Sequence, residues 1–356
     1  DGYVTDQEPQ EFTFEYQGSG TSVAEYAFTF EDEQTTVELS KADLTDKKEL
    51  PGASLKVTDE DGNTVDEWVS KEEAHIIKGL IVGKKYKMTE TKPADGYVTA
   101  ESIEFTVENT KEVQKHQMLD DVTKVEISKK DITDSSEVPG AKLIILDKDG
   151  KKVESWTSTD KPHMVEKLPV GEYTLREEQA PDGYLIAENV KFTVKDTGKV
   201  QKVKMKDAHP YGKLVIKKTD STSKATLPGA EFELREKESG KVVEKLVTDK
   251  TGTATSGKIP IATYKNGKVE KTVEYILVET KAPNGYELSS KKEEIRFEYK
   301  DGKTKVIEIV KEIKNTKSPS GSTPTGNSPK TGDSTNIWLP ILLAVLSACG
   351  IGSVIW

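Results

Sequence analysis

The chain has 356 residues, of which 34% are hydrophobic and 32% are charged, and its formal net charge is −10. This length is enough for roughly two to four small domains, and the acidic balance argues against a nucleic-acid partner because such a chain does not neutralise phosphates. The single cysteine, Cys349, excludes a disulfide framework and a zinc site built on cysteines, and it lies in an apolar run that does not suit a nucleophile.

The first five residues, DGYVT, recur as residues 95–99. We therefore interpret residues 1–32 as the C-terminal remnant of a truncated upstream repeat, and we expect this segment to be incompletely folded or exposed at an edge. It contains no recognisable signal peptide.

Internal repetition continues along the chain. The tetrapeptide LPGA or VPGA begins at residues 50, 138 and 227, so the repeats are 88 and 89 residues apart. Trp68 and Trp156 occupy matching positions, and Leu246 is their expected counterpart in the third repeat. We predict three domains, at residues 33–121, 122–209 and 210–316.

Each repeat has the pattern of a series of short strands. Turn signals such as DEDG, DKDG and KESG recur at intervals of roughly eight to twelve residues, and no long segment has helical periodicity. The pattern predicts an all-β fold of tandem antiparallel β-sandwiches of about 90 residues each. In the third repeat, residues 259–272 add the length of one hairpin.

The opening strand of each repeat carries an inward lysine. In the sequence VEISKKD, strand alternation places Val125, Ile127 and Lys129 on one face. An inward ammonium is costly to desolvate and is seldom left unpaired. The same alternation in the later strands predicts a buried trio in every repeat: Lys41, Glu90 and Asp120; Lys129, Glu177 and Asp207; Lys218, Glu279 and Asn315.

Two interpretations of these trios stay open on alternation alone. A buried ion pair would account for an inward lysine, and so would a reaction among the three side chains. In the first repeat, Asp121 is a second candidate beside Asp120, although alternation with Met118 favours Asp120.

The glutamate strands carry the motifs YKMTETKPADGY, YTLREEQAPDGY and YILVETKAPNGY. They resemble the motif YxLxETxAPxGY of the Cna B-type, or SpaA-type prealbumin-like (Ig-like), domains of Gram-positive surface adhesins and pilins, and the resemblance covers nearly all of residues 33–316. It implies an intramolecular isopeptide bond in each domain, promoted by Glu90, Glu177 or Glu279. The implied bonds are Lys41–Asp120, Lys129–Asp207 and Lys218–Asn315.

Burial explains how such a reaction could proceed. Desolvation disfavours charge, so it favours a neutral amine and a protonated carboxylic acid. The protonated glutamate can then polarise the acceptor carbonyl and pass protons to the leaving group, which is water from aspartate and ammonia from asparagine. Each domain would react once with itself, so we do not expect an enzyme. Asp32, which aligns with Asp120, would be an orphan acceptor.

The C-terminal part combines a linker and an apolar segment. Residues 317–327 are rich in proline, serine, threonine and glycine, and residues 328–356 resemble a sortase sorting signal of the LPXTG type, with an apolar stretch at 337–356 long enough for a transmembrane helix. The resemblance implies cleavage between Thr331 and Gly332. Ser328 stands where leucine is usual and no basic tail follows the apolar stretch, so we expect a truncated tail, with a simple membrane anchor as the alternative.

These observations predict an extracellular, cell-wall-anchored stalk, either the shaft of an adhesin or an accessory or basal pilin. Sortase would attach it to peptidoglycan or to a pilin lysine, and the membrane segment would hold it only transiently. The alternative is that one domain is itself a binding module for a host extracellular-matrix protein or glycan, with Ile261 and Tyr264 of the extra hairpin as the candidate patch. His75 and His163 have the pattern of repeated packing residues and the acidic turns lack a calcium-loop glutamate, so we expect no metal and no cofactor.

Overall fold

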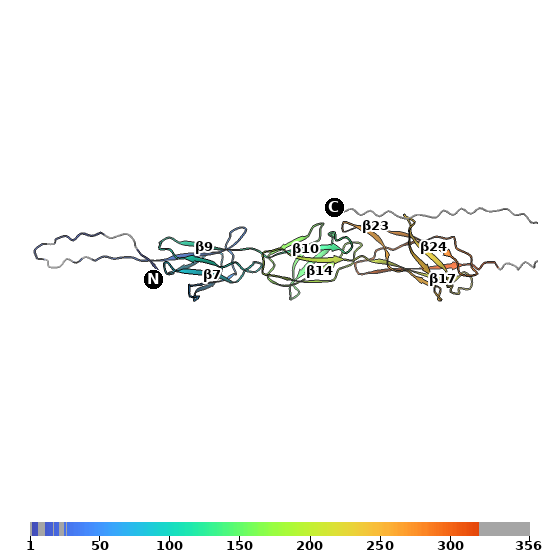
Figure 1. Ribbon diagram of the computed structural model, residues 1–356, viewed down its shortest axis with the longest axis horizontal. Coiled ribbons are helices and arrows are strands. Elements are labelled where there is room, and N and C mark those ends of the chain that lie inside the picture. Colours follow the sequence, from blue (N-terminus) through green and yellow to red (C-terminus); the bar gives the residue numbers. More distant parts are fainter. Residues whose placement is uncertain (1, 6–10, 17, 21–24, 26, 320–356) are drawn as a thin grey trace, which may run out of the picture. The chain divides into compact units, whose positions relative to one another are not determined.

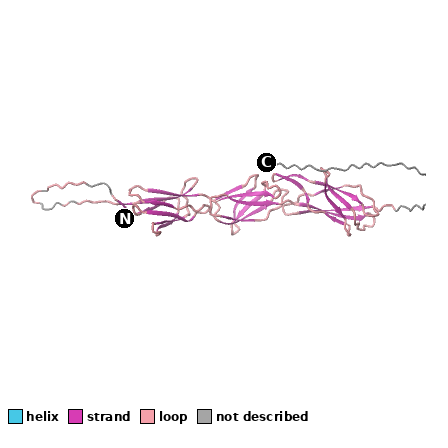
Figure 2. Cartoon of the chain, viewed as in Figure 1, coloured by secondary structure: helices cyan, strands magenta, loops and turns pink. Residues whose placement is uncertain are grey.

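The structure, a computed structural model, describes residues 2–5, 11–16, 18–20, 25 and 27–319. Within these ranges the secondary structure consists of β-strands without a helix (Figure 1; Figure 2), which confirms the predicted all-β fold class. Accordingly, this part of the chain holds no helix long and apolar enough to cross a membrane. The predicted transmembrane segment at 337–356 lies outside the described residues.

The first domain is a sandwich of two sheets. The inner strand of the smaller sheet is the lysine strand, and the order is β6 (His75–Lys78), β3 (Thr36–Asp43) and β9 (Gln114–Asp120). The larger sheet contains the glutamate strand, and its order is β5 (Thr64–Val69), β4 (Ser54–Thr58), β7 (Lys85–Lys92) and β8 (Ile103–Thr106).

The second domain repeats this topology strand for strand. Its smaller sheet has the order β13 (His163–Glu166), β10 (Lys124–Asp131) and β16 (Gln201–Asp207). Its larger sheet has the order β12 (Lys152–Thr157), β11 (Lys142–Leu146), β14 (Gly171–Gln179) and β15 (Val190–Val194).

The third domain keeps the plan and adds the predicted hairpin. In the first sheet, β17 (Tyr211–Asp220) pairs with β20 (Thr253–Thr255), β21 (Ile259–Pro260) and β26 (Val306–Asn315). The second sheet has the order β19 (Val242–Val247), β18 (Glu231–Glu236), β24 (Glu274–Lys281) and β25 (Glu293–Arg296). The hairpin is formed by β22 (Ala262–Lys265) and β23 (Lys268–Thr272).

The sheets are antiparallel, as predicted, except for one strand pair in each domain. The first and last strands, β3 with β9, β10 with β16 and β17 with β26, run parallel. A parallel pair requires a crossover connection, and here the whole second sheet forms that crossover. The chain therefore enters and leaves each sandwich in the same direction along neighbouring strands.

Each domain has one hydrophobic core between its two sheets. The repeated positions are equivalent in the register of the strands: Leu55 faces Trp68 and Leu143 faces Trp156, and in the third domain Phe232 faces Leu246. Leu246 is thus the counterpart of the two tryptophans, as the sequence predicts. The apolar alternate positions of these strands fill the cores, as expected for a half-buried sheet face.

The segment before the first domain adds little to the sandwich. Its strand β1 (Tyr3–Val4) pairs with β2 (Glu33–Gln34). The side chains of Phe12 and Phe30 are 52% and 64% exposed, whereas Val4 is buried.

Candidate crosslinking centres

Every lysine, glutamate and acceptor of the three predicted trios lies in the interior of its domain. The lysines are at most 2% exposed, the glutamates 4%, and Asp120, Asp207 and Asn315 at most 2%. The lysines are buried because they continue the apolar face of the first strand, where alternate residues point into the core. Uncompensated charges at this depth would be strongly destabilising, so each trio must neutralise itself.

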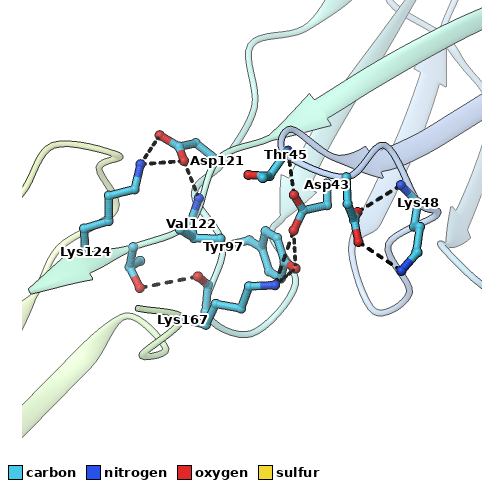
Figure 3. A network of polar contacts seen from close by, with 11 residues as sticks. Asp43, Thr45, Lys48, Tyr97, Asp121, Val122, Lys124 and Lys167 are labelled. Carbon is cyan, nitrogen blue, oxygen red and sulfur yellow. Dashed lines mark hydrogen bonds and ion pairs between the residues drawn. The ribbon is translucent and has the colours of Figure 1, made fainter. Parts of the chain in front are cut away.

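In the first domain the three side chains meet at one point. The Nζ atom of Lys41 lies 3.0 Å from Glu90 Oε1 and also contacts Asp120 Oδ1. The neighbouring candidate, Asp121, instead binds Lys124, with Nζ–oxygen distances of 2.8 and 3.0 Å (Figure 3). The geometry therefore brings Asp120, and not Asp121, to the lysine.

The second domain has the same arrangement. Lys129 Nζ lies 3.0 Å from Glu177 Oε2 and contacts Asp207 Oδ1. The side chains of this trio are at most 1% exposed. Two independent sequences thus place the same three groups in contact in the same dry environment.

The third domain places an amide where the others have a carboxyl group. Lys218 Nζ lies 3.0 Å from Glu279 Oε1 and donates a hydrogen bond to Asn315 Oδ1. The Nδ2 atom of Asn315 donates to both oxygens of Glu279, at 3.0 and 3.1 Å. The ring of Phe232 covers the amine, with its centroid 5.5 Å from Nζ.

Strand register produces these contacts. Lys41 lies opposite Met118 in the parallel pair, so the acceptor Asp120 is two residues further along and on the same face. The registers Lys129 to Met205 and Lys218 to Ile313 repeat this offset. The glutamate comes from the other sheet, and the lysine side chain spans the space between the two sheets.

Burial changes the electrostatics of the acceptors. Desolvation raises the pKa of Asp120 to about 7, although the hydrogen bond and charge of Lys41 oppose the rise. In the second domain, desolvation likewise raises the pKa of Asp207 to about 7, against the attraction of Lys129. In the third domain, desolvation lowers the pKa of Lys218. All three shifts favour neutral reactants.

The two aspartate centres contain buried oxygens without a donor. Among the described residues, Asp120 Oδ2, Glu177 Oε1 and Asp207 Oδ2 lack a hydrogen-bond partner, and Glu90 Oε1 makes no hydrogen bond beside its ion pair with Lys41. In each pair the glutamate contributes to the raised pKa of the aspartate. A proton held between the two carboxyl groups would satisfy their unpaired oxygens.

A backbone N–H orients each glutamate, a feature that the sequence analysis missed. Ala100 donates to Glu90 at 2.6 Å, Ala187 to Glu177 at 2.6 Å, and Ser289 to Glu279 at 2.9 Å. A backbone donor has no residue signature, and the one available signal was the constant separation of ten residues between donor and glutamate.

The other predicted residues lie elsewhere. Asp32 is exposed and outside the sandwiches, and Thr331 and Gly332 lie outside the described residues. His75 and His163 stack on Trp68 and Trp156, with ring centroids 4.1 and 4.4 Å apart, so they are packing residues as predicted. A search of the described ranges gives no cluster of His, Cys, Asp or Glu that could hold a metal ion.

The extra hairpin of the third domain is turned towards the second domain. Ile261 is buried, and Tyr264 stacks on His209 at a centroid distance of 3.4 Å. The hydroxyl of Tyr264 donates to the carbonyl of Gly183 at 2.8 Å. The two residues that we considered as a binding patch are therefore engaged within the chain.

Comparison with solved structures gives a broad set of matches. The Bacillus anthracis TIE protein matches with a TM-score of 0.53 and 28% identity over 80% of this chain. This chain spans about half, 51%, of the length of the TIE protein. BcpA, the major pilin subunit of Bacillus cereus, matches over 80% of this chain and 99% of its own, with a TM-score of 0.47 and 19% identity.

The full-length major pilin SpaD from Corynebacterium diphtheriae matches over 83% of this chain and 99% of its own, with a TM-score of 0.38 and 19% identity. Comparison with curated proteins gives no match. The family model of the SpaA prealbumin-like fold domain matches residues 35–121, 123–209 and 212–313. These three matches cover most of the chain, which therefore belongs to the family of proteins with SpaA-type prealbumin-like domains in tandem.

Proposed function

We propose that this chain is the structural stalk of a Gram-positive surface adhesin or accessory pilin, and that each domain locks itself with an isopeptide bond. The observation that carries the proposal is the buried lysine–glutamate–acceptor trio, which bridges the first and last strands of all three domains. A single buried ion pair would be unremarkable. The trio recurs in all three domains, and the acceptor always lies two residues beyond the register partner of the lysine. This recurrence supports a reaction between the lysine and the acceptor.

In the aspartate centres the reaction releases water. The neutral amine of Lys41 or Lys129 attacks the carboxyl carbon of Asp120 or Asp207, and the new C–N bond replaces a C–O bond. The glutamate donates a proton to the departing oxygen and takes one from the amine, so that no net proton is consumed. The raised pKa of Asp120 and of Asp207, to which the neighbouring glutamate contributes, supports this role.

In the asparagine centre the reaction releases ammonia. Lys218 attacks the amide carbon of Asn315, and the C–N bond to Nδ2 breaks. The Nδ2 atom already donates to both oxygens of Glu279, so the glutamate is in place to take a proton from the attacking amine and to pass it to the leaving nitrogen, which departs as ammonia. Each centre reacts once, so this is maturation and not turnover.

The bond would redirect mechanical load. Because the first and last strands are parallel neighbours, tension would run along β3 to Lys41, cross to Asp120 and continue into β10. Residues 42–119 would then bear no load. The bond would also close a loop with a sequence separation of 79 residues, a constraint worth about 4.5 kcal/mol on the chain-entropy model.

Attachment belongs to the same proposal. The sequence SPKTG, residues 328–332, supports recognition by a sortase that cuts between Thr331 and Gly332 and joins the threonine to peptidoglycan or to a pilin lysine. The stalk would then be extracellular and cell-wall anchored. Binding of a host matrix protein or glycan by one of these domains lacks a supporting feature in the hairpin, because Ile261 and Tyr264 are engaged within the chain.

Single-molecule pulling tests the stalk function. The chain is tethered through Glu33 and Lys317 and extended. We expect the wild type to extend without releasing the interior of any domain, and Glu177→Ala to release residues 130–206 in one additional step of about 3.5 Å per residue. Glu178→Ala, at the exposed neighbouring position, is the matched control and should behave as wild type. Release of all three interiors in the wild type would refute the load-bearing role.

A further inference from the structure

Each lysine strand carries a second buried ionisable group that the crosslinking chemistry does not use. Asp43, Asp131 and Asp220 lie two residues beyond the three lysines on the same face, and they are 8%, 0% and 2% exposed. Each is the register partner of an acceptor: Asp43 of Asp120, Asp131 of Asp207, and Asp220 of Asn315. A buried carboxylate at the same place in three domains calls for a role.

These carboxylates are held as anions by a dense set of donors. Burial would raise the pKa of Asp43, but hydrogen bonds from the Thr45 N–H, Tyr97 and Lys167 outweigh it and lower the pKa to about 2. Similar donor sets lower the pKa of Asp131 and of Asp220 to about 2. The groups stay ionised at physiological pH, so they do not serve as proton donors in the reaction.

The tyrosine that ends the DGY or NGY sequence of each glutamate motif interacts with one of these aspartates. Tyr97 donates its hydroxyl proton to Asp43 Oδ2 at 2.8 Å (Figure 3), and Tyr184 donates to Asp131 Oδ2 at 2.7 Å. In the third domain the hydroxyl of Tyr286 helps to lower the pKa of Asp220. In the first domain Lys167 of the second domain completes the cluster, with its Nζ 2.6 Å from the Tyr97 hydroxyl and 3.3 Å from Asp43 Oδ2. We call the aspartate and tyrosine of each domain the latch.

The loop that carries the tyrosine also touches the other two reaction partners. Ala100, three residues after Tyr97, donates its N–H to the glutamate Glu90. Val98 donates its N–H to the carbonyl of Asp121, next to the acceptor, at 2.9 Å. The second and third domains repeat the last contact, from Leu185 to Ala208 at 2.9 Å and from Glu287 to Thr316 at 3.0 Å.

We propose that the latch tyrosines Tyr97, Tyr184 and Tyr286, with their aspartates Asp43, Asp131 and Asp220, are positioning residues for isopeptide bond formation. The latch ties the end of the lysine strand to the loop that orients the glutamate and flanks the acceptor. It thereby holds all three reaction partners in register without touching the reacting atoms. This inference rests on the proposed crosslinking function.

The time course of crosslinking in the full chain tests the latch. The chain is made by cell-free synthesis and is unfolded in urea before the isopeptide bonds form. It is then refolded by dilution and sampled over time. Peptide mapping by mass spectrometry assigns each lost water or ammonia to its domain. For Tyr97→Phe we expect the first-domain bond to form about tenfold more slowly, the effect of losing one hydrogen bond to a charged group. The isopeptide bonds of Lys129 and Lys218 should form at their wild-type rates, and these rates serve as internal controls.

A purely structural role is separated by a second variant. Val57→Ala removes buried volume from the same core and leaves the latch loop intact. In a Glu90→Gln background, which cannot crosslink the first domain, the two substitutions are compared for their effect on thermal unfolding. The latch is supported if Tyr97→Phe slows the bond more than Val57→Ala does at equal or smaller loss of stability.

Three outcomes would overturn the inference. If Tyr97→Phe crosslinks the first domain at the wild-type rate, or if Val57→Ala slows the bond as much, the tyrosine does not position the reaction. A wild-type chain that loses neither water nor ammonia would overturn both the crosslinking function and the latch. Failure of the latch alone is therefore distinguishable from failure of the crosslinking function.

Discussion

The first two domains have an aspartate as acceptor, and the third domain has an asparagine. All three centres bury a lysine and a glutamate, but they differ in the number of protons on the acceptor side chain. In the aspartate centres, the acceptors Asp120 and Asp207 each present an oxygen without a hydrogen-bond donor in the described structure. In the third centre, the amide of Asn315 brings its own protons and donates to both oxygens of Glu279. An aspartate centre therefore needs one more bound proton than the asparagine centre to reach its reactive state.

This difference explains where the pKa shifts occur. In the aspartate centres burial raises the acceptor pKa to about 7, which keeps the extra proton bound. In the asparagine centre the acceptor does not titrate, and burial instead lowers the pKa of Lys218. Each of these shifts favours the neutral form of the group concerned.

The largest expected effect follows from removing a nucleophile. Lys129→Met should abolish the water loss of the second domain and lower its stability by at least about 4.5 kcal/mol, because the covalent closure of the loop is lost. Intact mass and thermal unfolding measure the two effects. Lys130→Met, one residue along and half-buried, is the control and should keep the bond; a crosslinked Lys129→Met domain would contradict the assignment of the nucleophile.

The next prediction uses pH to separate the two kinds of centre. Above about pH 7 the acceptors Asp120 and Asp207 lose their proton, and a carboxylate resists attack by an amine. Bond formation in the first two domains should therefore slow between pH 7 and 9, while the third domain continues to react. The refolding time course with peptide mapping, run at several pH values, measures all three rates in one sample. Equal pH profiles in the three domains would remove the distinction.

Exchanging the acceptor should move this pH dependence. Asn315→Asp should make the third domain lose water instead of ammonia and make its rate fall above about pH 7. The reciprocal variant, Asp207→Asn, should release ammonia from the second domain and lose the alkaline decline. If each domain keeps its wild-type pH profile after its acceptor is exchanged, the surrounding residues set the pH dependence and the acceptor does not.

Stability of the unreacted state gives a further, smaller effect. In Glu177→Gln, which we expect not to crosslink the second domain, the charge of Glu177 no longer raises the pKa of Asp207, but desolvation, the largest cause of the rise, remains. We therefore expect the folded pKa of Asp207 to stay above its ordinary value of 3.8, so protonation contributes stability that is complete below about pH 4 and is lost as the pH rises through the folded pKa. Urea unfolding of this variant at pH 5 and pH 8 measures the loss. Higher stability at pH 8 would show that Asp207 is ionised in the folded domain.

The smallest predicted effect crosses a domain boundary. Lys167 belongs to the second domain but binds both Asp43 and Tyr97 of the first (Figure 3). Lys167→Met should slow the first-domain bond by a few-fold, on the order of one exposed charged hydrogen bond, and leave the second-domain bond unchanged. Lys161→Met, an exposed lysine of the same domain, is the control. An unchanged first-domain rate would confine the latch to Asp43 and Tyr97.

Strand alternation in the sequence was sufficient to find the buried trios, because a period of two fixes which side chains share a face. It also favoured Asp120 over Asp121, and the structure brings Asp120 to Lys41. The same alternation would have flagged Asp43, two residues beyond Lys41, but an aspartate at the end of a strand has the ordinary pattern of a turn residue.

Other features could not be found from the sequence because they depend on long-range pairing. The parallel pairing of β3 with β9 joins residues about 80 apart, and no local pattern distinguishes it from an antiparallel neighbour. The N–H donors Ala100 and Ala187 act through the backbone, so their side chains carry no signal. In the sequence, Tyr264 lies in a hairpin with many lysines, which suggested an exposed aromatic side chain. Its contact with His209 depends on the neighbouring domain and could not be predicted.

The intact mass of the full chain, with Glu177→Ala measured beside it, tests the central claim most directly. Three completed bonds predict a wild-type mass lower than that of the sequence by two waters and one ammonia, and a variant that regains one water apart from the substitution itself. A wild-type mass equal to that of the sequence would contradict the account and leave the three trios as buried ion pairs.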